Sequence, residues 1–440
     1  MSPTDIVDAA ISRAMKEIFE YKFIPWRLRV RNSDFEPSMT GNKKRITHID
    51  IHQYNANTET AIKGLIGEVD ESYNLTISED GKVKMHALTH IGALRALDTF
   101  TQLFYQHSET EEEVYTVQAP VSIVDKPRFH HRGLNLDVAR NWFPVKNILH
   151  TIDAVAWNKF NRLHLHMTDS QSWPLEIPTF PELSEKGAYK KGLSYSPQQL
   201  KEIQAYGAAR GVQVIIEIDM PGHTASIAYS KPELITAFNM QPHWELYAHQ
   251  PPSGQFKLND TNVTDFVNKL LEDVLPRVSR YTSYFHTGGD ELNVNAYLLD
   301  EGVKSNKTDV IRPLLQKFID NAHEKVRAKG LTPIVWEEMT MAWNLTLGDD
   351  VLVQAWQNDS MVIGSVNKGH KTIAGNYHYW VSDAEQTYRS TQANIFSTVS
   401  RLRPRTMGLT SREGRQADRD QAALCRLLLA AEVVAADVRL

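Results

Sequence analysis

Cysteine is almost absent from this sequence. The only one among the 440 residues is Cys425, so neither an intrachain disulfide nor a zinc site built on cysteines can form. No apolar run approaches the length that spans a bilayer. The net charge of −5 gives no reason to expect nucleic acid or a membrane surface as a partner. The composition is that of a globular protein, long enough for one large domain and a smaller one.

A secretory signal is missing as well. The first residues, "MSPTDIVDAAISRAMKEIFEYKF", contain an early acid and no apolar core segment, so we expect no signal peptide in this chain. N-x-S/T sequons are nevertheless more frequent than chance suggests, which indicates an origin in the secretory pathway. A chain with sequons and no signal is expected to be incomplete at its front end. The sequons begin at Asn74, Asn259, Asn262, Asn306, Asn344 and Asn358.

Residues 1–128 are predicted to form a small, non-catalytic α+β domain. "ESYNLTI" and "GKVKMHAL" alternate apolar and polar residues like two strands of a sheet. The stretch "ALTHIGALRALDTFTQLFYQ" has apolar residues at helical spacing. "APVSIVDKPRF", residues 119–129, is typical of an edge strand followed by a linker.

Residues 129–380 show a different pattern, in which short apolar strands alternate with amphipathic helices. The strand candidates are "RGLNLDV", "RLHLHMTD", "QVIIEIDMPGH", "YFHTGGDE", "TPIVWEE", "DVLVQAW" and "HKTIAGN". This alternation predicts a parallel sheet, and its length favours a (β/α)8 barrel. Most strands end in polar or aromatic residues, at the end where barrel enzymes carry their chemistry. These are Asp137, Asp169, Asp219 with His223, Asp290 with Glu291, Glu337 with Glu338, and Trp356.

Residues 381–440 depart from this pattern. Residues 401–440 contain eight arginines but no lysine, asparagine or aromatic residue. "AALCRLLLAAEVVAADVRL" is compatible with a helix, but no strand with a polar carboxyl end follows "HKTIAGN". We therefore expect a helical or disordered tail and a barrel that lacks its last strand, with an open edge. The break is also what a mis-spliced transcript would produce.

The adjacent acids Asp290 and Glu291 are the strongest catalytic candidates. Neighbouring side chains of an extended chain point to opposite sides, so each acid can serve a different atom of one substrate. Gly288 and Gly289 before them permit close approach of the backbone. The alternative for the pair is a solvated loop that caps a helix.

Histidines and tryptophans admit two interpretations. His164 and His166 lie on one face of a strand, which is a metal-binding arrangement if His223 or His286 joins them, but buried structural histidines are commoner. Trp336 and Trp356 are either core residues or flat walls of a sugar pocket. Arg132 is either a surface charge or a fork of donors for vicinal hydroxyls.

The motifs together resemble those of the eukaryotic β-N-acetylhexosaminidases of glycoside hydrolase family 20. The similarity rests on "RGLNLDVARNW", "NRLHLHMTDSQSWPLEI", "EIDMPGHTAS", "HTGGDELN", "VWEE" and "VQAW", in the family's order. The resemblance implies exo-acting, retaining hydrolysis of terminal β-linked N-acetylhexosamine without a cofactor or a metal. In this family the substrate's own acetamido oxygen attacks the anomeric carbon and forms an oxazolinium ion.

The resemblance also implies roles for the candidate residues. Glu291 would protonate the leaving oxygen and Asp290 would accept the acetamido N–H. To donate a proton, Glu291 should have a raised pKa. The resemblance assigns the sugar hydroxyls to Arg132, a network with Glu291 to Asp169 and His223, and the acetamido methyl to Trp336 and Trp356.

The implied partners are glycans that end in N-acetylglucosamine or N-acetylgalactosamine, or chitin oligosaccharides, and a homodimer is left open. Nucleic acid and membrane are not expected. The family places the protein outside the cell or in the vacuole or lysosome. Val381 stands where the family has a tyrosine for the acetamido oxygen, and Asp383 is near the position of a sugar-binding aspartate. This departure leaves two alternatives, a truncated inactive relative that at most binds N-acetylated sugars, and a metal-dependent amidohydrolase built on His164, His166 and His223.

Overall fold

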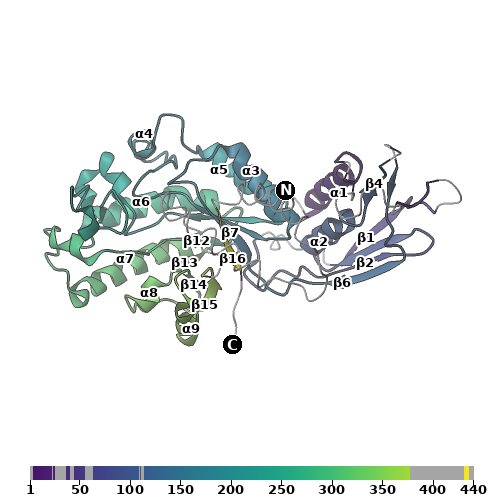
Figure 1. Cartoon of the computed structure of the whole chain (residues 1–440). Helices are drawn as coiled ribbons and strands as arrows, with labels where there is room; N and C mark the ends of the chain where they lie inside the picture. Colours follow the sequence, from purple (N-terminus) through teal and green to yellow (C-terminus); the bar gives the residue numbers. More distant parts are fainter. Residues whose placement is uncertain are drawn as a thin grey trace, which may run out of the picture.

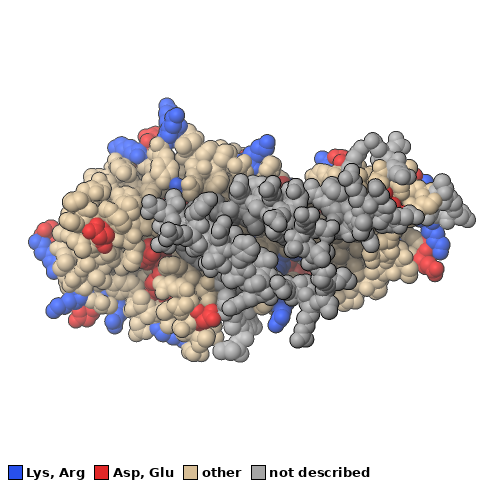
Figure 2. All heavy atoms as spheres, in the orientation of Figure 1, with Lys and Arg blue, Asp and Glu red and all other residues tan. Residues whose placement is uncertain are grey.

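A computed structural model describes residues 3–21, 23–24, 36–39, 44–54, 63–108, 110, 113–376 and 431–435. The predictions for Val381, Asp383 and Cys425 lie outside these residues. None of the described helices is long and apolar enough to cross a membrane. On the face shown in Figure 2, the described basic and acidic side chains are interspersed and gather in no single patch of one sign.

The N-terminal domain is a four-stranded sheet with helices packed against it (Figure 1). The predicted strands, the helix and the edge strand are all confirmed. In the sheet order β1-β3-β2-β6, β1 pairs parallel with β3 and the other pairs are antiparallel. The elements are α1 (Pro3–Phe19), β1 (Ile49–Gln53), β2 (Tyr73–Ile77), β3 (Val83–Ala87), α2 (His90–Thr101), β4 (Tyr105–Gln106), β5 (Val114–Tyr115) and β6 (Val121–Asp125).

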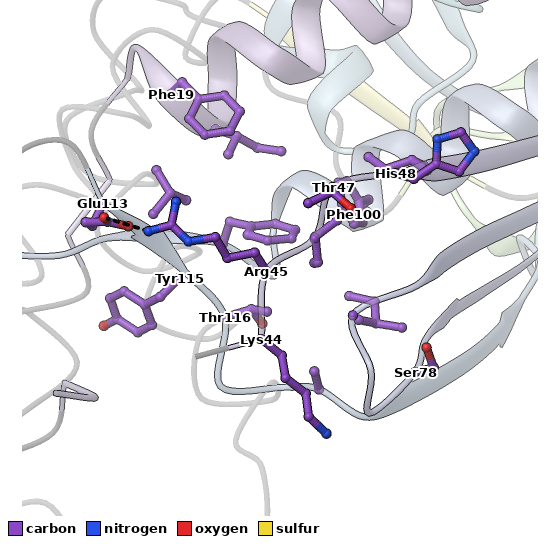
Figure 3. A pocket seen from close by; sticks show the side chains of 18 of the residues that line it. Phe19, Lys44, Arg45, Thr47, His48, Ser78, Phe100, Glu113, Tyr115 and Thr116 are labelled. Atoms are coloured by element: carbon purple, nitrogen blue, oxygen red, sulfur yellow. Dashed lines mark ion pairs between the residues drawn. The ribbon is translucent and has the colours of Figure 1, made fainter. Parts of the chain in front are cut away.

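Local signals in the sequence explain these elements. Along β2 and β3 every second side chain is buried, as period-2 patterning requires. Helix α2 begins at Thr89, whose side chain accepts a hydrogen bond from the Gly92 N–H. Between α1, α2 and the sheet lies a hollow of about 960 Å³ (Figure 3). At its rim Arg45 and Glu113 form an exposed ion pair of 3.5 Å.

The larger domain contains seven parallel strands in chain order, and all seven predicted strands are confirmed. They are β7 (Arg132–Asp137), β8 (Arg162–His166), β9 (Gln213–Glu217), β12 (Tyr284–His286), β13 (Thr332–Trp336), β14 (Leu352–Ala355) and β15 (Lys371–Ala374). Each strand is buried over most of its length, because the barrel interior covers one face and helices cover the other.

Helices connect the strands in the predicted alternation (Figure 1). They are α3 (Val145–Trp157), α4 (Glu182–Gly187), α5 (Pro197–Ala208), α6 (Thr261–Val278), α7 (Thr308–Ala328), α8 (Glu338–Met341) and α9 (Asp359–Asn367). Helix α5 begins with a capping box in which the Ser196 and Gln199 side chains each accept a backbone N–H of the other residue. The connection from β9 to α6 also carries the hairpin β10 (Ile235–Thr236) and β11 (Gln255–Phe256), which the sequence did not predict.

The prediction for the tail is wrong at one point. Residues 431–435 form the strand β16 (Ala431–Ala435) instead of a helix. Strand β16 pairs antiparallel with β7 and approaches β15, so β7 is not an open edge. This part of the tail is rich in small and β-branched residues, and the free backbone groups of β7 offer it a ladder.

Candidate active site

Parallel strands all end at the same side of the barrel, and the predicted acids meet there. Asp169, Asp219 and Asp290 follow β8, β9 and β12, and Glu337 follows β13. Their side chains converge on one imidazole, that of His223, or on one another. The rule that barrel chemistry lies at the carboxyl ends of the strands therefore identified this cluster correctly.

His223 lies between the two adjacent acids. Its Nε2 is 3.5 Å from Oδ2 of Asp290 and 3.5 Å from Oε2 of Glu291. Both His223 and Glu291 have left-handed backbone, with φ of 53° and 50°, which a residue with a side chain seldom adopts. Such strained conformations cluster at functional sites, where the surrounding fold maintains them. The solvated-loop alternative does not fit this arrangement, because the side chain of Asp290 is only 16 % exposed.

The two glycines before the acids are needed for close packing, as predicted. Gly288 has φ of 70°, and a Cβ on it would lie 1.8 Å from Oδ1 of Asp219. The Gly289 N–H donates to the same oxygen at 2.9 Å. Any larger residue at position 288 would push apart Asp219, after β9, and the segment after β12 that carries Asp290.

Asp169 is fully buried, and its carboxylate contacts one guanidinium and two imidazole rings. Its Oδ2 is 2.8 Å from Nη2 of Arg140 and 2.7 Å from Nε2 of His166, and its Oδ1 is 3.1 Å from Nδ1 of His223. Burial raises the pKa of Asp169, but the charges of Arg140 and His223 and the hydrogen bonds from both imidazoles outweigh burial and hold it well below its usual value. Asp169 is therefore ionised and fixes His223 in place.

The structure does not bring Arg132 to this site, and that prediction is wrong. Arg132 is the first residue of β7 and lies at the amino end of the strand, away from the acids. Its Nη2 is 2.6 Å from Oε2 of Glu71 in the N-terminal domain, and its Nε donates to the Lys159 carbonyl at 2.8 Å. It joins the two domains instead of facing a substrate.

Arg140 is the arginine that the sequence reasoning missed. It follows the carboxyl end of β7, and Nη1 is 2.9 Å from Oδ2 of Asp137. The same guanidinium contacts Asp169 and lies 3.4 Å from Nδ1 of His223. Its position after the strand, eight residues beyond Arg132, was the signal that could have found it.

Both predicted tryptophans lie at strand ends, but in different environments. Trp336 is 4 % exposed, and its Nε1 donates to Oε1 of Glu217 at 2.8 Å. Trp356 is half-buried, and its Nε1 donates to Oε1 of Glu338 at 3.0 Å. Each indole is thus oriented by a carboxyl group. The ring of Trp336 also packs against His164 and His286, with ring centroids 6.0 and 4.9 Å apart.

Glu337 and Glu338 are a second adjacent pair of acids. Glu337 accepts the backbone N–H groups of Trp356 and Gln357 at 3.0 and 3.1 Å. Burial raises the pKa of Glu337 to about 7, and burial together with the charges of Asp290 and Glu337 raises the pKa of Glu338 to about 9. At neutral pH Glu338 is therefore a neutral acid.

The expected raised pKa of Glu291 is not observed. Burial raises the pKa of Glu291, but the hydrogen bond and the charge of His223 outweigh it, and the net pKa is lowered. The adjacent acid differs, since burial is the largest effect on Asp290 and raises its pKa. The imidazole that faces Glu291, more than its sequence neighbour, determines its charge.

The alternative of a metal site on His164, His166 and His223 finds these histidines in three separate groups with acids, each of metal-binding size. His164, His166 and His223 do not share one metal-sized cluster among the described residues. His164 and His286 meet at Glu217, and both ring nitrogens of His166 are each 2.7 Å from a carboxylate oxygen. The ring nitrogens of His166 are therefore engaged by acids, which is the arrangement of a structural network.

Comparisons with known proteins agree with this site. The model of "Glycosyl hydrolase family 20, catalytic domain" matches residues 129–422, and that of "beta-acetyl hexosaminidase like" matches residues 2–103. A β-hexosaminidase of Arthroderma benhamiae is 44 % identical over 385 residues, which are 86 % of this chain and 63 % of that protein. A chitooligosaccharidolytic β-N-acetylglucosaminidase of Ostrinia furnacalis is 30 % identical over 365 residues, 78 % of this chain and 59 % of that protein.

The solved structures show the same architecture. The chitobiase of Flavobacterium johnsoniae superimposes with a TM-score of 0.67 at 25 % identity and covers 85 % of this chain and 54 % of its own. The chain spans a little under two thirds of the length of curated relatives that it matches. Since the catalytic-domain model matches well over half of the sequence, the chain belongs to glycosyl hydrolase family 20.

Proposed function

We propose that this chain is an exo-acting β-N-acetylhexosaminidase. The observation that carries the proposal is the pair Asp290 and Glu291 on either side of His223, at the carboxyl ends of the strands of a family 20 barrel. The reaction is hydrolysis, with retention, of a terminal β-linked N-acetylglucosamine or N-acetylgalactosamine. Handling of the substrate's acetamido group distinguishes this family from glycosidases that supply their own nucleophile.

In the proposed mechanism the two acids act on different atoms. Asp290 accepts the acetamido N–H and stabilises the positive charge of the oxazolinium ion. Glu291 donates its proton to the leaving oxygen and then activates water as a base. Because the pKa of Glu291 lies below its ordinary value, the protonated form of Glu291 becomes populated only as the pH falls into the acidic range. The basic limb of kcat/KM is therefore expected at acidic pH.

The rest of the site would hold the sugar. Trp336 and Trp356 enclose the acetamido methyl group with their indole faces. Arg140 replaces Arg132 as the donor for ring hydroxyls, because its guanidinium lies beside Asp169 and His223. The pKa of Arg140 is raised by Asp169 and Asp137 against the effect of burial, so it is always charged.

The test compares Glu291→Gln with wild type on two N-acetylglucosaminides. With a methylumbelliferyl leaving group, which needs protonation, kcat/KM should fall by roughly 10²–10⁴-fold. This ratio reports departure of the leaving group and not the later activation of water by Glu291. With a dinitrophenyl leaving group, which departs without a proton, the loss should be much smaller. Equal losses on both substrates would contradict the assignment of Glu291. If wild type turns over neither substrate but binds N-acetylglucosamine in an NMR titration, the chain is the non-hydrolysing relative.

We also propose a secretory or lysosomal location and glycosylation. All six sequon asparagines are exposed, which is the placement that glycosylation requires. A mobility shift after amidase digestion of protein from a eukaryotic host would test this proposal.

The proposed partners are N-acetylglucosamine- or N-acetylgalactosamine-terminated glycans and chitin oligosaccharides, and we propose that the chain forms a homodimer. Relatives from Dictyostelium discoideum and Mus musculus are named as subunits. Sedimentation velocity distinguishes a dimer from a monomer.

A further inference from the structure

The network that holds Glu291 continues into the centre of the barrel. Its links are His223 Nε2 to Glu291 Oε2 at 3.5 Å, Asp169 Oδ1 to His223 Nδ1 at 3.1 Å, and Asp169 Oδ2 to His166 Nε2 at 2.7 Å. A fourth link joins His166 Nδ1 to Glu217 Oε2 at 2.7 Å. Acids and imidazoles thus alternate along one chain, and the side chains of Asp169 and Glu217 are completely buried.

We propose that Glu217 and His166 are positioning residues for the catalytic acid of this site. Glu217 fixes the ring of His166, His166 fixes the carboxylate of Asp169, and Asp169 holds His223 against Glu291. The proposal rests on the function proposed above, and neither Glu217 nor His166 touches the substrate.

The ring of His166 can hold Asp169 in place because both of its nitrogens contact a carboxylate, one of Asp169 and one of Glu217. An imidazolium between two carboxylates donates at both ends, so its orientation is fixed. Burial lowers the pKa of His166, but the charge of Glu217 and hydrogen bonds to Asp169 and Glu217 outweigh it and raise the pKa well above its usual value. The ring therefore stays protonated while both acids are ionised.

Glu217 is itself held rigidly. It lies on β9 directly beside His166 on β8 in the strand register. Its Oε1 accepts the indole N–H of Trp336 at 2.8 Å, and its Oε2 lies 2.8 Å from Nε2 of His164. Nδ1 of His286 is 3.4 Å from Oε1. One carboxylate thus connects Trp336, the proposed wall of the acetamido pocket, to the network that ends at the catalytic acid.

Other charged groups also face this network and contribute to its titration. The charged groups that face His166 are Glu217, Asp169, Asp137 and Asp219. Those that face His223 are Asp169, Asp219, Asp290, Glu291 and Arg140. None of the groups that face His223 is itself replaced in a His166 or Glu217 variant, so an effect on His223 must pass through Asp169 or Asp219.

Two variants of His166 separate positioning from packing. The amide nitrogen of glutamine reaches about where Nε2 of histidine lies, and that of asparagine about where Nδ1 lies. His166→Gln therefore keeps a donor for Asp169 and loses the one for Glu217, whereas His166→Asn does the reverse. We expect kcat for a methylumbelliferyl substrate to fall about tenfold or more in His166→Asn and less in His166→Gln, with KM changed less than twofold. This estimate follows from the sensitivity of proton transfer to displacements near 1 Å.

The leaving group provides the second readout. A dinitrophenyl substrate needs little protonation, so both variants should approach wild type on it if His166 acts through Glu291. Equal losses in the two variants, or on the two substrates, would overturn the proposal. His90→Gln is the matched control, because His90 is a completely buried histidine in the N-terminal domain.

A readout without hydrolysis keeps the two proposals distinguishable. The ¹⁵N chemical shifts of the His223 ring report its protonation and hydrogen bonds. These shifts should change in His166→Asn, and they should change less in Glu217→Gln, which keeps the shape of the side chain and removes only its charge. Thermal unfolding and near-ultraviolet circular dichroism check that each variant is folded. Unchanged His223 shifts in folded variants would refute the positioning role. Shifted His223 signals in a chain that hydrolyses nothing would support it while the proposed function failed.

Discussion

The carboxylate that joins the two domains should be a major source of stability. Glu71 is 5 % exposed, and its Oε2 lies 2.9 Å from Nε of Arg95 and 2.6 Å from Nη2 of Arg132. Its Oε1 accepts a hydrogen bond from Nδ2 of Asn161 at 2.8 Å. Glu71 and Arg95 belong to the N-terminal domain, and the other two residues belong to the barrel. Glu71→Gln removes the charge and keeps the shape.

The magnitude follows from the pKa of Glu71. Burial raises this pKa, but the charges of Arg95 and Arg132 and their hydrogen bonds outweigh burial and lower it from 4.5 to about 2. At about 1.36 kcal/mol per pKa unit, that difference corresponds to roughly 3 kcal/mol. Because the folded pKa is depressed, this stability is fully present above pH 4.5 and is lost as the pH falls towards 2. Leaving two buried arginines without their acid costs a similar amount, roughly 3–5 kcal/mol.

Urea unfolding of wild type and Glu71→Gln measures the effect directly. At pH 7 the variant should lose about 3 kcal/mol of unfolding free energy, and the gap should shrink as the pH falls below 4.5. Glu185→Gln, at an exposed glutamate of α4, is the control and should change little. A loss below about 0.5 kcal/mol at pH 7, or a gap that does not depend on pH, would show that the charge of Glu71 does not stabilise the fold. Since Arg132 lies far from the catalytic end, kcat/KM per folded molecule should stay unchanged.

Three other substitutions test the site. Arg140→Lys keeps the charge and loses the planar fork, so kcat/KM should fall at least tenfold, mainly through KM; an unchanged KM would exclude Arg140 as a sugar ligand. Glu338→Gln mimics the neutral acid that a pKa of about 9 implies, so its activity should match that of wild type. Because wild type must keep this buried acid protonated, the unfolding free energy of the variant in urea should exceed that of wild type by an amount that grows as the pH rises from 4.5 towards 9. Glu338→Ala, by contrast, removes the acceptor for the Trp356 indole and should weaken discrimination between N-acetyl and N-butanoyl substrates; equal discrimination would contradict that role.

The strands of the barrel could be predicted because their sequence pattern is simple. A strand buried on both faces is a short apolar run, and its carboxyl end is polar where it faces a site. Both features are local, and they located β7 to β9 and β12 to β15. β16 could not be found in this way, because a strand of small and β-branched residues resembles a helix until a partner strand is known. The hairpin β10–β11 has only two residues in each strand, too few for a periodic signal.

A motif match alone did not place the arginine of the site, whereas the position of each arginine along β7 would have placed it. Both arginines belong to the motif "RGLNLDVAR", which by itself does not say which one meets the sugar. Arg132 opens the strand and Arg140 follows its end, so the two lie at opposite ends of β7. The strand-end rule that selected Asp169 and Asp290 also selects Arg140 when it is applied to arginines.

The charge of the catalytic acid depends on contacts that sequence proximity does not show. A raised pKa is expected for Glu291 because it must donate a proton, and burial or the charge of its neighbour Asp290 would be the cause. In the fold, His223 approaches from the connection after β9 and is the closest cation to Glu291, and its protonation is maintained by Asp169. The pKa of Glu291 therefore depends on His223, which Asp169 links to His166 and Glu217 at the centre of the barrel. A residue there can change the pH dependence of the reaction without ever meeting the sugar, which is why the network is best dissected by its titration as well as by its effect on rate.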